Sequence, residues 1–260
     1  MTVEMGLLNI DSIIIAHQLG ATALGFYALA FNVSSWPSTI ITNAVRKVSI
    51  AALNRMVQAG EDWRAAFARS LSLLIALLVP VCVLLGALAR PLVEFLYSTK
   101  SVPAAPVLAW LVVLGGIRVT LGFVLDLLIA HGKTHATLRA ELLWLVAAVP
   151  ALWFGAELGG IRGVAIGHVL AAALVAAPVF LLEARRVGAT LKPVGADLAR
   201  PALGAAAGVV VAALLVQRSN TPIVQLALAG SATIVAYVLV AVPRHKLGAV
   251  AARARHRLAG

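Results

Sequence analysis

Charged side chains are scarce in this chain, and their scarcity excludes most classes of protein. Asp, Glu, Lys and Arg make up only 12% of the 260 residues, against about 25% in ordinary soluble domains, whereas apolar residues make up 62%. A soluble fold of this length could not bury so much apolar surface. Apolar runs separated by short basic segments therefore predict a single polytopic membrane bundle rather than a soluble core with a linker.

Metal-binding, phosphate-binding and catalytic motifs are also lacking. Cys82 is the only cysteine and lies in an apolar run, which excludes an internal disulfide and a cysteine metal cluster. No two histidines have metal-ligand spacing, and no glycine-rich phosphate loop or Gly-x-Ser-x-Gly turn occurs. We therefore expect no enzyme activity, no metal and no cofactor. The net charge of +11 is spread between the apolar runs rather than gathered in one stripe, so we expect no nucleic-acid partner.

Eight apolar runs approach the length of about 20 residues that a membrane-spanning helix needs. The runs are continuous rather than alternating, and hydrocarbon leaves no backbone group unpaired, so they predict helices and an all-α fold. The predicted spans are residues 3–19, 26–45, 70–89, 104–130, 142–158, 163–182, 202–217 and 223–242.

Lys and Arg residues lie mostly on one side of this predicted topology. With Met1 in the cytoplasm, sixteen of the 21 lie in inner loops, four lie in outer loops, and Arg118 lies inside a span. Because Lys and Arg concentrate in cytoplasmic loops, this bias predicts a multi-pass protein of the plasma (inner) membrane with both termini in the cytoplasm.

The segment 46–69, between the second and third spans, mixes basic and apolar residues. Gly60, followed by Glu61 and Asp62, predicts the end of one helix and the start of another. We expect an interfacial helix whose basic face lies against the anionic lipid of the cytoplasmic leaflet. A solvated connecting loop is the alternative.

Glycine and proline positions predict how the spans pack and bend. Small residues at four-residue intervals allow helices to approach closely. Such intervals occur at Gly155, Gly159, Gly163 and Gly167, and again at Gly204 and Gly208. Pro37, Pro150 and Pro178 predict kinks, because proline removes an intrahelical hydrogen bond.

Two ionisable residues, Asp11 and Arg118, lie near the middle of the first and fourth spans and could share one depth. A charge in the bilayer centre costs about 2.5 to 3.5 kcal/mol even on insertion scales, so such residues need an explanation. In one interpretation they form a buried pair that holds two helices together. In the other, both face a water-filled cavity, where Arg118 attracts an anionic substrate and Asp11 sets the local field or carries a proton.

Other polar residues are weaker candidates for a site. We place Asn32 among the residues that line the predicted substrate cavity. Asp126 is a second candidate for proton or ion coupling, although it lies only about two turns from the inner end of its span. His17, His131 and His168 occur singly, and each is more readily a hydrogen-bonding or packing residue than a proton relay.

The first half of the chain resembles a known family of transporters. The resemblance begins with Asn9-Ile10-Asp11-Ser12-Ile13-Ile14-Ile15, Leu19-Gly20 and Leu24-Gly25-Phe26-Tyr27-Ala28-Leu29-Ala30, and continues at Ala52-Leu53-Asn54-Arg55 and Pro91-Leu92-Val93-Glu94-Phe95-Leu96-Tyr97. These stretches are similar to the second lobe of polysaccharide exporters and lipid-linked oligosaccharide flippases of the colanic-acid exporter type, in the multidrug/oligosaccharidyl-lipid/polysaccharide superfamily.

The resemblance implies spans seven to fourteen of a fourteen-span flippase. Residues 1–188 would form the second six-helix lobe, 189–242 two additional C-terminal spans, and 243–260 a basic cytoplasmic tail. In that family two lobes enclose a cavity and alternate in access around a glycan carried on polyprenyl pyrophosphate. Asp11 matches a family position, whereas the role of Arg118 as a diphosphate contact is inferred from its place in the span.

One lobe cannot alternate around a site that two lobes form. We therefore expect the chain to be a gene fragment, one half of a split transporter with a separate N-terminal lobe, or a homodimerising half. The leading hypothesis is an exporter lobe for cell-surface polysaccharide. The alternatives are the lobe of a drug or cation exporter, which would favour acidic cavity residues, and a non-transporting membrane scaffold that anchors glycosyltransferases through its basic loops.

Overall fold

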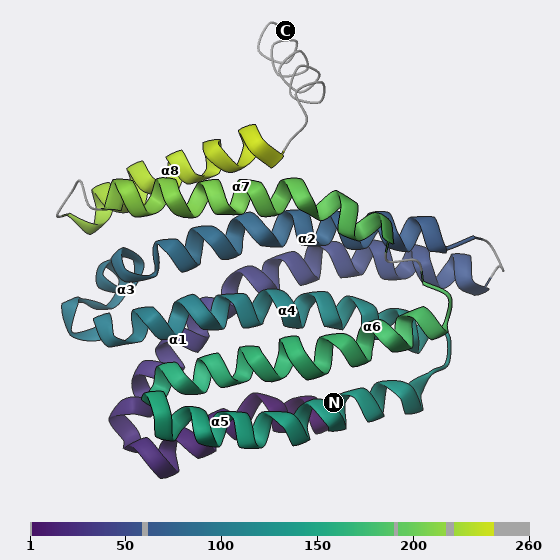
Figure 1. Ribbon diagram of the computed structural model, residues 1–260, viewed down its shortest axis with the longest axis horizontal. Helices are drawn as coiled ribbons and strands as arrows, with labels where there is room; N and C mark the ends of the chain where they lie inside the picture. Colours follow the sequence, from purple (N-terminus) through teal and green to yellow (C-terminus); the bar gives the residue numbers. More distant parts are fainter. Residues whose placement is uncertain (1, 59–61, 190–191, 217–220, 242–260) are drawn as a thin grey trace, which may run out of the picture.

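The computed structural model describes residues 2–58, 62–189, 192–216 and 221–241, and these residues form helices without any strand (Figure 1). The α-helices are α1 (Thr2–Gln58), α2 (Arg64–Ala87), α3 (Ala89–Tyr97), α4 (Ala105–Ala130), α5 (Thr134–Ala171), α6 (Ala177–Arg186), α7 (Lys192–Val216) and α8 (Pro222–Ala241). A 3₁₀ segment, Thr99–Ala104, precedes α4, and a π segment, Ala172–Ala176, joins α5 to α6. The predicted all-α membrane bundle is thereby confirmed.

Five segments of the described chain are long and apolar enough to cross a membrane, judged by length and composition. They are Ile10–Trp36, Arg64–Ala87, Thr99–Ala130, Thr134–Arg186 and Pro222–Val240, and Pro201–Leu215 is a shorter apolar helix. Ile10–Trp36 contains parts of the first two predicted spans, and Thr134–Arg186 contains the fifth and the sixth. The shorter helix Pro201–Leu215 corresponds to the seventh predicted span. At about 1.5 Å per residue, a straight helix over 53 residues would far exceed the membrane core of about 30 Å.

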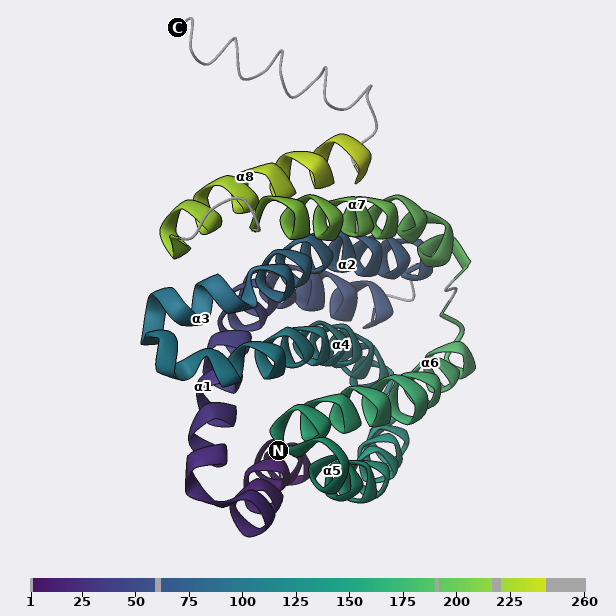
Figure 2. The same cartoon turned by 60° about the vertical axis from the view of Figure 1, so that its left-hand side comes forward.

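Glycines break both long segments into antiparallel arms. In α1 the backbone leaves the helical region at Gly20, where φ is 83°. In α5 it leaves at Gly159 and Gly160, where φ of Gly160 is 56°. Glycine adopts positive φ without steric cost, so the chain can reverse at these points (Figures 1 and 2).

The two arms around Gly160 touch through their backbones. A Cβ atom added to Gly155 or Gly163 would collide with the carbonyl oxygen of the other glycine. A Cβ atom on Gly167 would likewise collide with the carbonyl oxygen of Ala151. These partners are antiparallel across the bend, so the close packing predicted from the glycine spacing is confirmed at Gly155, Gly163 and Gly167, whereas a Cβ atom on Gly159 would meet nothing within 4 Å.

Proline has different effects at two positions in this region. The backbone of α5 keeps helical dihedral angles through Pro150. The π segment Ala172–Ala176 ends two residues before Pro178, and its wider turn accommodates a residue that has no N–H to donate.

Helix α4 lies at the centre of the bundle. It packs against α1, α2, α5 and α6, and its Leu108, Leu111, Leu127 and Leu128 are fully buried. Phe123 of α4 stacks on Phe67 of α2 with ring centroids 5.4 Å apart. The buried face of α4 therefore packs into the apolar interior, whereas residues 115–120 in its middle are only half-buried.

Helices α7 and α8 form a hairpin at the edge of the bundle (Figure 2). They pack on each other and on α2 and α3. Gly208 of α7 lies against Thr233 of α8 and Val83 of α2. The predicted division into 1–188 and 189–242 stays a prediction, and the predicted tail 243–260 lies outside the described residues.

One end of the bundle collects basic residues. The ring of Trp63, just before α2, lies 4.6 Å from that of His131 at the end of α4, and Arg64 Nε donates a hydrogen bond to the carbonyl of Gly188 after α6. The described basic residues near these helix ends are Arg64, Lys133, Arg139, Arg185 and Arg186. The bundle therefore brings together loops that the charge distribution assigns to the cytoplasm.

The segment 46–69 differs in part from expectation. Helix α1 continues through residue 46 to Gln58, so this part is helical rather than a loop, and its place at the membrane interface stays a prediction. Helix α2 begins at Arg64, which agrees with the helix boundary predicted around Gly60, although Gly60 itself lies outside the described residues.

Substituting Gly163 by Ala tests the close contact between the arms of α5. The added methyl group would overlap the carbonyl of Gly155, so we expect the free energy of unfolding to fall by about 1 to 3 kcal/mol. Gly25→Ala is the matched control, because its methyl group meets nothing within 4 Å and alanine favours a helix by about 1 kcal/mol. Thermal unfolding of both variants in detergent should show opposite shifts, and equal shifts would contradict the packing.

Candidate functional site

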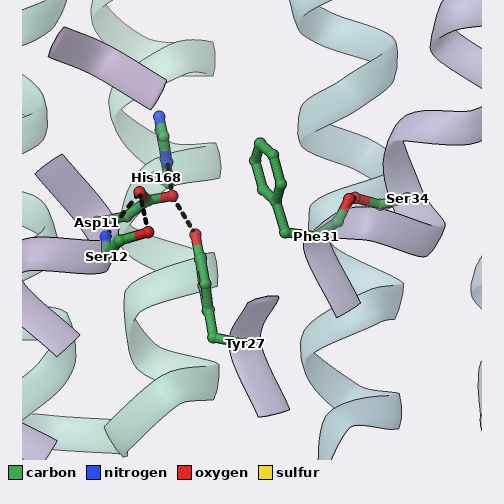
Figure 3. Close-up of polar contacts among 6 residues, drawn as sticks. All are labelled: Asp11, Ser12, Tyr27, Phe31, Ser34 and His168. Carbon is green, nitrogen blue, oxygen red and sulfur yellow. Dashed lines mark hydrogen bonds and ion pairs between the residues drawn. The ribbon is translucent and has the colours of Figure 1, made fainter. Parts of the chain in front are cut away.

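Asp11 is buried inside the bundle, with only 1% of its surface exposed. Its Oδ2 accepts a hydrogen bond of 2.7 Å from the hydroxyl of Tyr27, and its Oδ1 accepts one of 2.7 Å from the backbone N–H of Ser12 (Figure 3). Tyr27 follows Asp11 by sixteen residues and comes from the other arm of α1. The bend at Gly20 therefore brings the Tyr27 hydroxyl to the carboxylate of Asp11.

His168 completes the cluster from the second arm of α5. Its Nδ1 lies 3.9 Å from Asp11 Oδ2, and the residue is 1% exposed. Neither ring nitrogen has a hydrogen-bond partner among the described residues. The ring of His168 and that of Trp144 form a T-shaped pair, with centroids 6.3 Å apart. Three helical arms thus converge on one carboxylate in an apolar surrounding.

Arg118 lies in the middle of α4 and is half-buried. Its positive charge is close enough to act electrostatically on Asp11, Tyr27 and His168. The structure therefore brings the two predicted ionisable residues into one neighbourhood. Whether the two residues bind substrate or only join helices stays a prediction.

The other two predicted site residues lie elsewhere. Asn32 is exposed on α1, where its Oδ1 accepts a hydrogen bond of 3.0 Å from the indole N–H of Trp36. Asp126 is half-buried in α4, eight residues after Arg118 and so about 12 Å farther along the helix. Their roles in substrate binding and in ion coupling stay predictions.

Tyr27 and His168 were not among the predicted site residues. Tyr27 belongs to the stretch that carries the family resemblance, but its pairing with Asp11 depends on the angle of the bend at Gly20. His168 is a lone histidine in an apolar run, a pattern more typical of packing. In neither case does the spacing along the chain indicate the contact.

An apolar groove lies on another part of the bundle surface, and none of the cluster residues lines it. It has a volume of about 400 Å³ between α2, α4 and α6, and its walls include Cys82, Gly116, Ile117 and Leu181. Gly116 and Ile117 directly precede Arg118. The apolar walls of the groove have the chemistry of a site for a hydrocarbon chain.

The described residues contain no group of three His, Cys, Asp or Glu side chains placed to hold a metal ion. What the cluster does provide is a carboxylate whose charge is balanced by donors within an apolar bundle. A buried carboxylate of this kind could exchange a proton or hold a small cation, and a nearby guanidinium can bind a phosphate.

Comparisons with known proteins point to one family. Residues 1–106 match the family of polysaccharide biosynthesis proteins. An uncharacterized membrane protein in the cps region of Klebsiella pneumoniae is 27% identical over 166 residues, 64% of this chain and 34% of its own length. The lipopolysaccharide biosynthesis protein WzxC of Escherichia coli is 25% identical over 162 residues, 62% of this chain and 33% of its own length. The chain thus spans about a third of the curated relatives it matches.

A solved structure shows the same fold. The lipid II flippase MurJ in its inward closed conformation superimposes with a TM-score of 0.73 and 13% sequence identity, over 90% of this chain and 51% of the flippase. The family match, the relatives and the fold agree with the resemblance carried by the N-terminal stretches. Residues 1–106 are therefore similar to the family of polysaccharide biosynthesis proteins, and the chain has the fold of a lipid II flippase.

Proposed function

We propose that the chain is the second lobe of an exporter that moves a polyprenyl-pyrophosphate-linked glycan across the plasma membrane by alternating access. The observation that carries this proposal is Arg118, a cation held at the middle of the central helix beside the buried Asp11. The names of the relatives, which concern surface polysaccharides, and the fold of a lipid II flippase support it.

The chemistry of such a substrate suits the cluster. A guanidinium binds phosphate oxygens in a forked geometry, so Arg118 would hold the diphosphate. In the absence of substrate, Asp11 offsets the positive charge, and the substrate would compete with it. The apolar groove next to Ile117 suits the isoprenoid chain, which cannot enter water. Asn32, on an exposed face of α1, would contact the glycan.

The substrate path needs a second wall. In a two-lobe transporter the exposed face of one lobe meets the other lobe, and we infer that a separate N-terminal lobe or a second copy of this chain supplies it. The basic end formed by α2, α4 and α6 would face the cytoplasm, with both termini on that side.

Replacing Arg118 by Ala tests the diphosphate contact. We expect export of surface glycan to fall by about tenfold or more when the gene at its own locus carries Arg118→Ala, with Arg118→Lys retaining part of it. Surface polysaccharide is measured at equal membrane abundance. The control is Arg162→Ala, because Arg162 is basic but exposed at the end of the α5 bend.

Normal export in Arg118→Ala cells would contradict the proposal. If Arg118→Ala cells lost dye efflux but exported glycan normally, the result would instead favour a drug or cation exporter. Loss of glycan export only on altering the segment 46–69 would favour a scaffold for glycosyltransferases.

Replacing Asp11 by Asn tests ion coupling. Asparagine can still accept the hydrogen bond from Tyr27, so the fold should persist while the charge is removed. We expect Asp11→Asn cells to export at the same low rate with and without a proton or sodium gradient. Asp126→Asn tests the weaker candidate, and Asp62→Asn is the control, because that side chain is 74% exposed. If export by Asp11→Asn cells depended on the gradient as strongly as export by wild-type cells, Asp11 would be excluded as the coupling group.

A further inference from the structure

A second, more polar pocket lies near the two glycine bends. It has a volume of about 390 Å³ and lies between the end of the first arm of α1 and the end of the first arm of α5. The residues that line it are His17, Gln18, Leu19, Trp153, Ala156 and Glu157. Gln18 is seven residues from Asp11, so the pocket is about 10 Å from the buried carboxylate along α1.

Trp153 forms an accessible aromatic wall of this pocket. Its surface is 40% exposed, and its indole N–H donates a hydrogen bond of 2.9 Å to Glu157 Oε1. The ring of His17 lies at a tilt with its centroid 6.3 Å from that of the indole. The hydrogen bond to Glu157 restrains the indole plane, which leaves a flat apolar surface beside polar side chains.

Gln18 supplies an unused donor. Its Nε2 is buried and has no hydrogen-bond partner among the described residues. A buried donor without a partner is costly to the fold, and such groups are rare in stable proteins. A ligand that brings an acceptor oxygen into the pocket would remove this cost. Glu157 is exposed and offers acceptor oxygens to the same ligand.

We propose that this pocket binds one sugar ring of the glycan, a proposal that rests on the function proposed above. The apolar C–H face of a pyranose stacks on an exposed indole, and its hydroxyl groups can both accept from Gln18 and donate to Glu157. No Lys or Arg lines the pocket, which disfavours a phosphate as the ligand.

The position of the pocket fits an extended substrate. With the diphosphate at the depth of Arg118, a glycan that runs along α1 would reach the pocket after about 10 Å, a distance that a short oligosaccharide spans. The charge distribution places this end of the bundle on the outer face of the membrane. The pocket would therefore hold the leading sugars of the glycan as they leave the bilayer.

Saturation-transfer NMR tests the site directly. The full 260-residue chain in lipid nanodiscs is titrated with methyl glycosides of glucose, galactose, mannose and N-acetylglucosamine. We expect transfer to the ring protons of at least one of them, reduced about tenfold by Gln18→Leu and by Trp153→Ala. Phe154→Ala is the control, because Phe154 is an exposed aromatic neighbour that does not line the pocket.

The unfolding temperature separates a binding role from a structural one. Gln18→Leu removes a buried donor without a partner, so it should unfold at the same or a higher temperature than the wild type while losing the sugar. A lower unfolding temperature with sugar binding retained would overturn the site, as would absence of transfer from every glycoside to the wild type. The latter result would identify Trp153 as a membrane-interface anchor only.

This test does not depend on transport. Sugar binding in nanodiscs together with normal export in Arg118→Ala cells would overturn the proposed function and leave the sugar site standing. Failed binding together with lost export in those cells would overturn the sugar site alone.

Discussion

The buried carboxylate of Asp11 is the constraint on which the rest of the bundle depends. In hydrocarbon, a charge and every backbone polar group must find partners within the protein. Asp11 obtains them from Tyr27, Ser12 and the field of Arg118, with His168 beside it. Because these partners come from both arms of α1 and from α4 and α5, the carboxylate can be accommodated only when those helices are correctly assembled.

The glycine bends make that assembly possible. The bend at Gly20 places Tyr27 within hydrogen-bonding distance of Asp11. The bend at Gly159 and Gly160 reverses α5, and His168 on its second arm lies beside the same carboxylate. Close backbone contact between the arms of α5 holds the second arm, which carries His168, against the first. The same two bends bring the ends of α1 and α5 together, where the pocket with Trp153 and Gln18 is found.

Much of the fold could be predicted from the sequence, because membrane burial makes long apolar runs helical. The shared neighbourhood of Asp11 and Arg118 followed from their depth in the spans. The partnership of Tyr27 and His168 with Asp11 did not, because it depends on bend angles that spacing along the chain does not encode. Helix α3 is only nine residues long and carries no span signal, so it was missed for lack of length.

The central claim is that Arg118 faces a water-filled substrate path rather than only completing a buried ion pair. The most direct measurement is labelling of an Arg118→Cys variant, in a Cys82→Ala background, by a thiol reagent that does not cross membranes. The account predicts labelling, and protection from it by polyprenyl diphosphate. An unlabelled Arg118→Cys, in a preparation where Lys133→Cys at the end of α4 is labelled, would contradict it.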